Sequence, residues 1–481
     1  MNLFSSIKTY IATPIYRVAF QHPFYSAQKA IRARTSSSSV LIFAFVAALV
    51  IANIPAISHY YFDLWDYPVV LQIGDFNLFS HGGHPMSLLS FINDALMAIF
   101  FFTIGLEIKR EVMVGELSSL RQALLPILGA IGGMIAPVLI FMFMSQGTDY
   151  SGGAAIPMAT DIAFSLGVLA ILGSRVPISL KVFLTTLAVV DDIGGIIVIA
   201  ICYTTEMHAE LLLWAAGLLV VMIAGSRAGI QSKAFYITIG VIIWYLFLNS
   251  GIHPTIAGVI VAFCIPAKPV YHPYKYIRKI RKAIAKFNRE DEKRLKQSTV
   301  LSKQELNWLK EIESASDKVI SPAQDLEDTL APFVNYFVVP AFAFANAGIY
   351  LLDMSVGDAF QGLSLAIILG LVVGKFVGIF SFSWLAIVSR VAPMPSRSTW
   401  KMLAAVSMLG GIGFTVSLFI ATLSFPGAAN AELLNHAKLG IVVGSLLSGA
   451  LGLLFLSLVM PKHRAAGAKP QKSRKSQKAA D

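Results

Sequence analysis

Long apolar segments recur along the whole chain, and they constrain its fold more than any other feature. About twelve of them are long enough, or nearly so, to cross a hydrocarbon core of roughly 30 Å as a helix. Hydrocarbon offers no hydrogen-bond partner to an irregular backbone, so each segment is expected to be helical. The segments lie near residues 39–57, 87–110, 121–144, 154–172, 178–202, 209–225, 233–249, 252–266, 331–350, 362–389, 402–423 and 438–460. The pattern predicts an all-α polytopic membrane protein.

Composition supports a membrane protein and argues against an ordinary soluble domain. Of the 481 residues, 56% are hydrophobic and only 14% are charged, which is unusual for a soluble domain. The formal net charge of +11 is explained by basic residues in every second connection. These are Lys109, Arg110 and Arg121, then Arg175 and Lys181, then Arg227 and Lys233, then the 267–330 segment, then Arg390, Arg397 and Lys401. Short basic loops stay in the cytoplasm, so both termini are expected there and no nucleic-acid partner is needed.

These features divide the chain into five parts. Residues 1–38 form a basic N-terminal segment without an apolar core or cleavage site, so we expect a cytoplasmic segment and not a signal peptide. Residues 39–266 carry spans I–VIII, and residues 331–460 carry spans IX–XII. Residues 267–330 form a cytoplasmic insert, and residues 461–481 form a polybasic cytoplasmic tail.

The insert contains two helix signals. Ile277, Ile280, Ile284 and Phe287 recur at helical spacing among Lys and Arg, which predicts an amphipathic helix lying at the membrane interface. Ser302 with Glu305 is typical of a capping box that opens a second helix. A further start signal at Ser321 and Pro322 indicates that the ninth span begins as a cytoplasmic helix before it enters the bilayer.

The connection 58–86 contains strand-like residues on both sides of a Gly-Asp turn, within 69–79. A hairpin protruding there would suit a contact between two copies of the chain. A local cap over the outer surface explains the same pattern equally well.

Two adjacent aspartates, Asp191 and Asp192, interrupt the apolar run 182–201. A charge at the bilayer centre costs roughly 2.5–3.5 kcal/mol on insertion scales, so neighbouring carboxylates in one span indicate an ion or proton site. Burial and a like-charged neighbour both favour the protonated carboxyl. Protons and a small cation would therefore compete for the same oxygens, which is sufficient for antiport at an alternately exposed site. Carboxylate oxygens suit Na⁺ or Li⁺ and not soft metals.

Two other apolar segments contain helix breakers. Pro157 precedes Thr160 and Asp161, and three glycines occupy four positions in 410–413. Paired interruptions of this kind point to a transporter site, with Asp161 balancing the positive ends of half-helices. The alternatives are a proline-kinked helix with an aspartate cap, and glycines that permit close helix packing.

Lys375 lies near the middle of the tenth span, too far from either end to reach water fully. Such an ammonium needs a carboxylate partner or must lose its proton. Neighbouring helical positions point about 100° apart, so Asp191 and Asp192 cannot both face one atom. We expect one carboxylate to face the ion and the other to face Lys375.

Several runs together resemble the bacterial NhaA-type sodium/proton antiporters. They are NDALM at 93–97, GLEIKRE at 105–111, ATDIAF at 159–164, LGSRVP at 172–177, VDDIG at 190–194 and GIGFT at 411–415. The resemblance implies twelve spans with two inverted repeats, III–V and X–XII, whose broken helices IV and XI cross at mid-membrane. It also implies an inner-membrane secondary transporter, not an enzyme, that needs no cofactor. Such a transporter exports Na⁺ or Li⁺ against two entering protons, is electrogenic and is activated at alkaline pH.

The same resemblance assigns roles to residues. Asp192 is expected to be the principal ion ligand, with Asp191 as its partner and Thr160 nearby. Asp161 and Lys375 are expected to compensate charge. A pH-responsive cluster on the cytoplasmic side is expected to consist of Glu107, Arg110, Glu111 and Glu327. An ordinary charged helix end is the alternative for the first three.

Other classes of protein fit the sequence less well. An intramembrane aspartyl protease needs Tyr-Asp and Gly-x-Gly-Asp contexts on separate helices, and no span has them. A passive cation channel does not require a carboxylate pair together with an intramembrane lysine. A haem protein is disfavoured because only His253, His208 and His436 lie near spans, at positions typical of helix ends.

Overall fold

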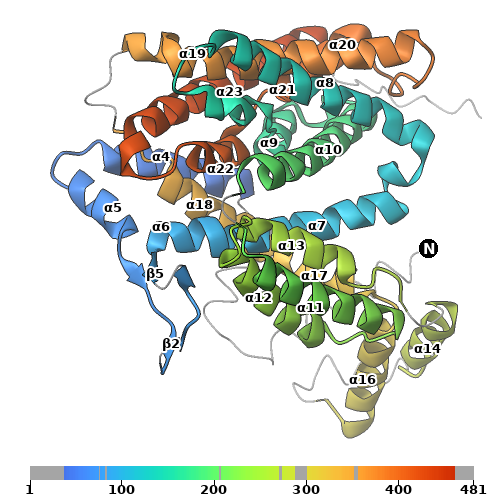
Figure 1. Cartoon of the computed structure of the whole chain (residues 1–481). Coiled ribbons are helices and arrows are strands. Elements are labelled where there is room, and N and C mark those ends of the chain that lie inside the picture. The colour runs from blue at the N-terminus through green and yellow to red at the C-terminus, as the bar shows by residue number, and fades with distance from the viewer. Residues whose placement is uncertain are drawn as a thin grey trace, which may run out of the picture.

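The computed structural model describes residues 37–460 except 75, 82–83, 205–206, 270–272, 288–300 and 351–355. The predicted tail and nearly all of the predicted N-terminal segment therefore lie outside the described residues. Helices run side by side through most of the molecule, as Figure 1 shows. Short strands lie at one end, called here the hairpin end, and helices α14 and α16 lie at the other, called the insert end.

Within the described residues, eight helical segments are long and apolar enough to cross a membrane. They are Leu88–Val114, Arg121–Met144, Ser151–Leu172, Ile178–Cys202, Ala209–Arg227, Pro322–Asn346, Gly362–Val388 and Ala431–Val459. A ninth is a pair of helices bent by 44° at a short break, Trp400–Leu409 with Phe414–Ser424. Three shorter apolar helices are Ser37–Ala52, Lys233–Leu248 and Pro254–Cys264. These segments match the predicted ones in order, which confirms the all-helical polytopic class.

The helices that position the central site come from two separate parts of the chain. The first part comprises α8 (Leu120–Met144), η3 (Ser151–Met158), α9 (Ile162–Leu172), η4 (Gly173–Arg175) and α10 (Ile178–Cys202). The second comprises α19 (Gly362–Leu369), η7 (Gly370–Gly374), α20 (Lys375–Val388), α21 (Trp400–Leu409), α22 (Phe414–Ser424), η8 (Ala428–Asn430) and α23 (Ala431–Val459). In each part, a short break interrupts one span, between η3 and α9 and between α21 and α22.

Helices α8 and α20 approach each other closely at two glycines. A Cβ atom on Gly132 would lie 2.3 Å from the Gly378 carbonyl oxygen, and one on Gly378 would lie 2.1 Å from the Gly132 carbonyl oxygen. Any larger residue would push the two helices apart, because real Cβ atoms do not approach backbone this closely. Lys375 lies about one turn before Gly378, so this contact holds the lysine deep inside the protein.

The remaining spans surround this centre. They and their connections are α4 (Ser37–Ala52), α5 (Ser58–Trp65), α6 (Leu88–Ser90), η1 (Phe91–Leu96), α7 (Met97–Val114), η2 (Glu116–Ser118), α11 (Ala209–Arg227), α12 (Lys233–Leu248), α13 (Pro254–Cys264), α17 (Pro322–Phe333), η5 (Val334–Val338), α18 (Val339–Asn346) and η6 (Val356–Phe360). The segments η1, η5 and η7 are π-helical, and such segments widen a helix locally and often lie at functional sites.

The hairpin end carries five short strands, β1 (Pro68–Val69), β2 (Gln72–Ile73), β3 (Phe76–Asn77), β4 (Ser80–His81) and β5 (His84–Ser87). Strand β2 pairs antiparallel with β3, and β5 lies between β1 and β4. Gly74 has a φ of +61°, a conformation that favours glycine. Residues on both sides of the predicted turn, Gln72–Ile73 and Phe76–Asn77, thus form a hairpin, whereas Val69 pairs with Met86. Asp75 of that turn lies outside the described residues.

The insert contains α14 (Pro273–Ala285) and α16 (Lys303–Asp317), which pack against each other. Ser302 and Glu305 form the predicted capping box. Part of the apolar stripe of α14 faces α16: Ile280 and Ile284 are half-buried, and the Phe287 ring meets the Trp308 ring at 5.1 Å. Much of the predicted stripe therefore packs against α16, whereas Ile277 is exposed, and the contact of this helix with the membrane interface stays a prediction.

Candidate ion-binding site

The two helix breaks cross each other in the centre of the protein and satisfy each other's backbone groups. The Asp161 backbone N–H donates to the Ile412 carbonyl at 2.7 Å. The Thr160 hydroxyl donates to the Gly410 carbonyl at 2.8 Å, and the Ser417 hydroxyl donates to the Ile156 carbonyl at 2.8 Å. Groups that a helix break would leave unpaired in an apolar environment thus find partners in the other break.

Asp161 serves the amino ends of two half-helices at once. Its Oδ1 accepts from the Phe164 backbone N–H at 2.9 Å, which caps α9. Its Oδ2 accepts from the Thr415 backbone N–H at 3.2 Å and from the Thr415 hydroxyl at 2.6 Å, at the start of α22. Helix amino ends carry partial positive charge, so one carboxylate lies where both half-helices favour it. Asp161 is therefore both the cap of a proline-broken helix and the carboxylate that balances two half-helix amino ends, so the two interpretations of this break do not exclude each other.

Lys375 is fully buried and contacts Asp191. Its Nζ lies 2.5 Å from Asp191 Oδ2 and donates to the Thr160 hydroxyl at 3.0 Å. The other carboxylate oxygen, Asp191 Oδ1, is buried and has no hydrogen-bond partner among the described residues. Half of the Asp191 carboxylate is thus committed to the lysine.

Asp192 faces a cavity instead. The cavity has a volume of about 460 Å³ and reaches from the centre towards the insert end. Of the described residues, its inner part is lined by Thr160, Asp161, Asp192 and Thr415; Asp191 and Lys375 are not among the lining residues. No described residue donates a hydrogen bond to Asp192, although its side chain is only 6% exposed. Its oxygens are therefore open to the cavity.

Charged residues gather around Arg110 at the insert-end mouth of this cavity. Its Nη1 lies 2.5 Å from Glu327 Oε1, and its Nη2 lies 3.2 Å from Glu111 Oε1 and 4.0 Å from Glu107 Oε1. Glu107, Arg110 and Glu327 line the cavity. The four residues expected to form a cluster are thus in contact, although Glu327 is more than 200 residues distant in sequence.

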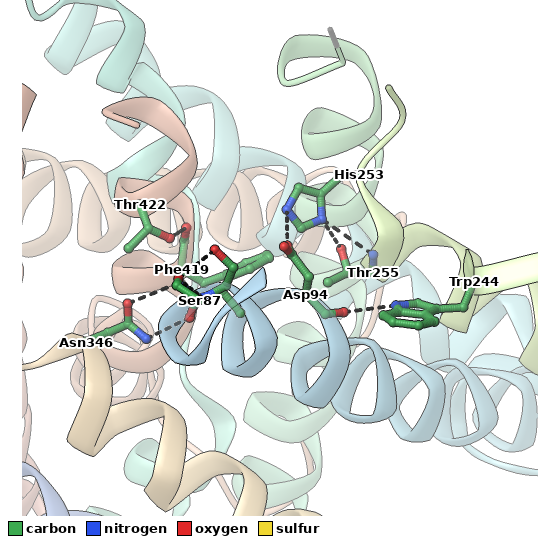
Figure 2. Close-up of polar contacts among 10 residues, drawn as sticks. Ser87, Asp94, Trp244, His253, Thr255, Asn346, Phe419 and Thr422 are labelled. Carbon is green, nitrogen blue, oxygen red and sulfur yellow. Dashed lines mark hydrogen bonds and ion pairs between the residues drawn. The ribbon is translucent and has the colours of Figure 1, made fainter. Parts of the chain in front are cut away.

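The structure adds a polar layer at the hairpin end that the sequence analysis missed. The Asn346 side chain, at the end of α18, donates to the Asn93 Oδ1 in η1 at 2.8 Å. Next to it, His253 Nε2 lies 3.5 Å from Asp94 Oδ1. Figure 2 shows Trp244 reaching the Asp94 carbonyl, at 3.1 Å. Asn93 and Asp94 belong to the run at 93–97, but their partners lie far away in the chain.

Aromatic rings close the protein next to this layer. The Phe419 ring is fully buried and meets the rings of Phe101 at 5.5 Å, Phe342 at 6.1 Å and His253 at 5.4 Å. The centre is thus separated from the hairpin end by packed rings and paired amides, whereas the cavity reaches it from the insert end.

The arrangement can be compared with known proteins. A family model described as Na⁺/H⁺ antiporter 1 matches residues 28–456. The chain belongs to this antiporter family. The Na⁺/H⁺ antiporter NhaA of Phocaeicola vulgatus is 52% identical over 441 residues, 92% of this chain and 97% of the relative. NhaA of Bacteroides fragilis is 54% identical over 430 residues, 89% of this chain and 97% of the relative. NhaA of Parabacteroides distasonis is 47% identical over 456 residues, 94% and 98% of the two chains.

Membership in the antiporter family confirms the resemblance found in the sequence. The protein is a multi-pass membrane transporter and not an enzyme. Na⁺/H⁺ antiport is the activity of the family, and it uses no cofactor. The protease and haem alternatives are thereby excluded, and the family's inverted repeats agree with two parts that each contain one broken span.

Proposed function

We propose that the protein exports Na⁺ or Li⁺ across the bacterial inner membrane in exchange for external protons, at a site built around Asp191 and Asp192. The observation that carries this proposal is the difference among three buried aspartates. Asp161 lines the cavity but is occupied by helix amino ends, and Asp191 is held by Lys375 away from the cavity. Of the three, only Asp192 both lines the cavity and accepts no hydrogen bond from a described residue. Asp192 is then the principal cation ligand, with Asp191 as its partner and Thr160 nearby.

Competition for the Asp192 oxygens couples the two ions. A buried carboxylate without a partner is costly unless a proton or a cation neutralises it. Each time the site binds Na⁺ it must release a proton, and each time it takes up a proton it must release Na⁺. Asp161 and Lys375 compensate the remaining fixed charges. Exchange of two protons for each Na⁺ requires a second proton, which the Asp191–Lys375 pair would release when Na⁺ binds, and this would make transport electrogenic.

The two ends of the molecule support a mechanism of alternating access. Basic connections predict that the insert end and both termini are cytoplasmic, so the cavity would admit cytoplasmic Na⁺ to Asp192. Release on the other side then requires the aromatic cluster around Phe419 to move and the Asn93–Asn346 pair to separate. A passive channel would not need such a barrier to reform in each cycle.

Regulation by pH is assigned to the charged cluster at the cavity mouth. Glu107, Arg110, Glu111 and Glu327 lie close enough for their titrations to be coupled. We infer that this cluster sets the pH range of activity, with activation at alkaline pH. The β2–β3 hairpin within 69–79 is the proposed contact between two copies of the chain, because it leaves polar strand edges near the surface.

The test is Na⁺-driven proton movement in proteoliposomes containing the purified protein. A sodium gradient should drive proton flux in wild-type vesicles, and Asp192→Asn should abolish it because the amide keeps the shape but binds neither ion well. Asp149→Asn, on an exposed connection, is the matched control and should transport normally. Full exchange by Asp192→Asn would refute the site, and Na⁺ flux without proton flux would refute antiport.

A further inference from the structure

Helix α14 presents a basic surface that the transport site does not use. The helix carries five Lys or Arg residues and no acidic residue. Tyr276, Ala283 and the half-buried isoleucines face α16, so the cations lie on the opposite side of α14. They are Lys275, Arg278, Lys279, Arg281 and Lys282, and all are exposed. Within the described part of the chain, no carboxylate forms an ion pair with any of them. Lys279 weakly attracts the Glu311 carboxylate of α16, but among the described residues the surface still carries a net positive charge.

The partner helix has the opposite character. Helix α16 carries two lysines and four acidic residues, so the pair has one basic face and one mildly acidic face. Polar contacts join α14 and α16 at both ends of their interface. Lys286 Nζ lies 2.8 Å from Glu311 Oε2, and Lys318 Nζ lies 5.6 Å from the centre of the Tyr276 ring. The basic face is thus held on one side of a packed helical pair.

The chain keeps this pair near the membrane surface. Helix α13 ends at Cys264 and α14 begins at Pro273, and an extended chain of that length spans at most about 30 Å. Where the chain leaves the insert again, at the start of α17, the Ala323 backbone N–H donates to the Pro266 carbonyl at 3.3 Å. Both ends of the insert are therefore tied together where spans end, and Figure 1 shows α14 and α16 together beyond those ends.

Apolar groups accompany the cations on the exposed side of α14. The Tyr274 side chain is 79% exposed and that of Ile277 is 46% exposed. Tyrosine is favoured at the level of lipid headgroups, and basic helices with a few such side chains adhere to anionic bilayers. The surface thus combines charge for phosphate groups with side chains for the apolar boundary beneath them.

We propose that α14 docks on anionic phospholipid headgroups of its own membrane, with Arg278 and Lys282 among the contacting residues and α16 facing water. The docking orients the insert relative to the bilayer and does not depend on the proposed ion site. Ile280, Ile284 and Phe287 of the predicted stripe hold α16. The cations, with exposed Tyr274 and Ile277, provide the contact with lipid.

The test measures the environment of α14 in the full-length protein. Ala285→Cys, on the exposed end of α14, is labelled with a fluorophore in a chain whose Cys202 and Cys264 are replaced. The protein is placed in nanodiscs of phosphatidylcholine with or without phosphatidylglycerol, and quenching by neutral acrylamide is recorded. Phosphatidylglycerol should protect the label, and high salt should reverse the protection.

Two double variants distinguish this docking from general attraction of a basic protein. Arg278→Gln with Lys282→Gln should lower the ratio of docked to free α14 by about tenfold or more, because each cation near an anionic surface contributes about fivefold. Lys303→Gln with Lys310→Gln removes the same charge from the exposed side of α16 and should leave protection unchanged. Equal protection in both lipids, or equal loss in both variants, would overturn the proposal.

Discussion

Replacement of Lys375 by alanine tests the central ion pair most directly. The lysine and the Asp191 side chain are both completely inaccessible to solvent, with Nζ and Oδ2 2.5 Å apart. Breaking a buried pair by removing one partner costs about 3–5 kcal/mol, because the remaining charge is left without compensation. Thr160 also loses a donor at 3.0 Å, which adds about 1 kcal/mol. We expect a marked fall in the melting temperature of the purified protein.

The stability lost in Lys375→Ala should increase as the pH rises. Without Lys375, the Asp191 carboxyl can avoid a buried charge only by keeping a proton, and keeping it becomes harder by about 1.4 kcal/mol for each unit of rising pH. The destabilisation should therefore be largest at alkaline pH and shrink as the pH falls. Thermal unfolding in detergent, followed by intrinsic fluorescence across a pH series, measures this trend.

A second substitution provides the control. Asp191→Asn in the Lys375→Ala background removes the uncompensated charge, so the double variant should be more stable at alkaline pH than Lys375→Ala alone. The coupling between the two sites should amount to at least about 1 kcal/mol, as expected for residues in contact. Additive losses in the double variant, or a Lys375→Ala protein whose melting does not change with pH, would show that the pair contributes no stability.

Three further predictions concern transport. Lowering the pH should raise the Na⁺ concentration needed for half-maximal exchange, because protons and Na⁺ compete at Asp192; a half-maximal concentration independent of pH would contradict a shared site. Glu327→Gln should move the pH midpoint of activity in everted vesicles but leave Na⁺ affinity at fully active pH unchanged; the reverse pattern would place Glu327 in the ion site. Asn346→Ala removes the amide pair with Asn93, worth about 1 kcal/mol, and should increase access to Asp192 from the hairpin end about fivefold in a cysteine-labelling assay; unchanged labelling would remove the pair from the barrier.

Hydropathy was sufficient to place the spans, but the ends of some helices depend on other interactions. Helix α17 begins at Pro322, ahead of the hydropathy-defined span at 331, and the Ser321 side chain caps it, as the start signal there predicts. Helix α23 begins at Ala431, ahead of the predicted 438. Hydropathy reports only the part of a helix that lies in hydrocarbon, whereas helix ends are set by caps and by local hydrogen bonds.

The residue pattern predicts a site at the aspartate pair, and only the family resemblance, not the pattern, says which carboxylate faces the ion. The angle between neighbouring helical positions required two different directions, and either assignment satisfied it. The structure places Lys375 beside Asp191, on a helix that approaches α8 closely at Gly132 and Gly378. A contact between residues so far apart in the chain leaves no periodic signal in the sequence.

Distance along the chain also explains why the sequence does not predict the partners of Thr415 and His253. Thr415 belongs to the run GIGFT at 411–415, yet its hydrogen bond to Asp161 joins residues 254 positions apart. His253 has the expected place at a helix end, where it caps α13, but its contact with Asp94 could not be inferred from that place. Local patterns predict helices and breaks, and only the packing of distant helices decides which polar groups meet.

The three buried aspartates show how one environment can give equivalent side chains different tasks. Each is an acceptor in an apolar interior, and each must be compensated. Backbone donors compensate Asp161 permanently, since the half-helices cannot move away without losing their caps. Lys375 compensates Asp191 through a charge that is part of the chain. Asp192 has no donor among the described residues; in the proposed mechanism a mobile ion completes it, arriving through the cavity and leaving on the opposite side of the membrane.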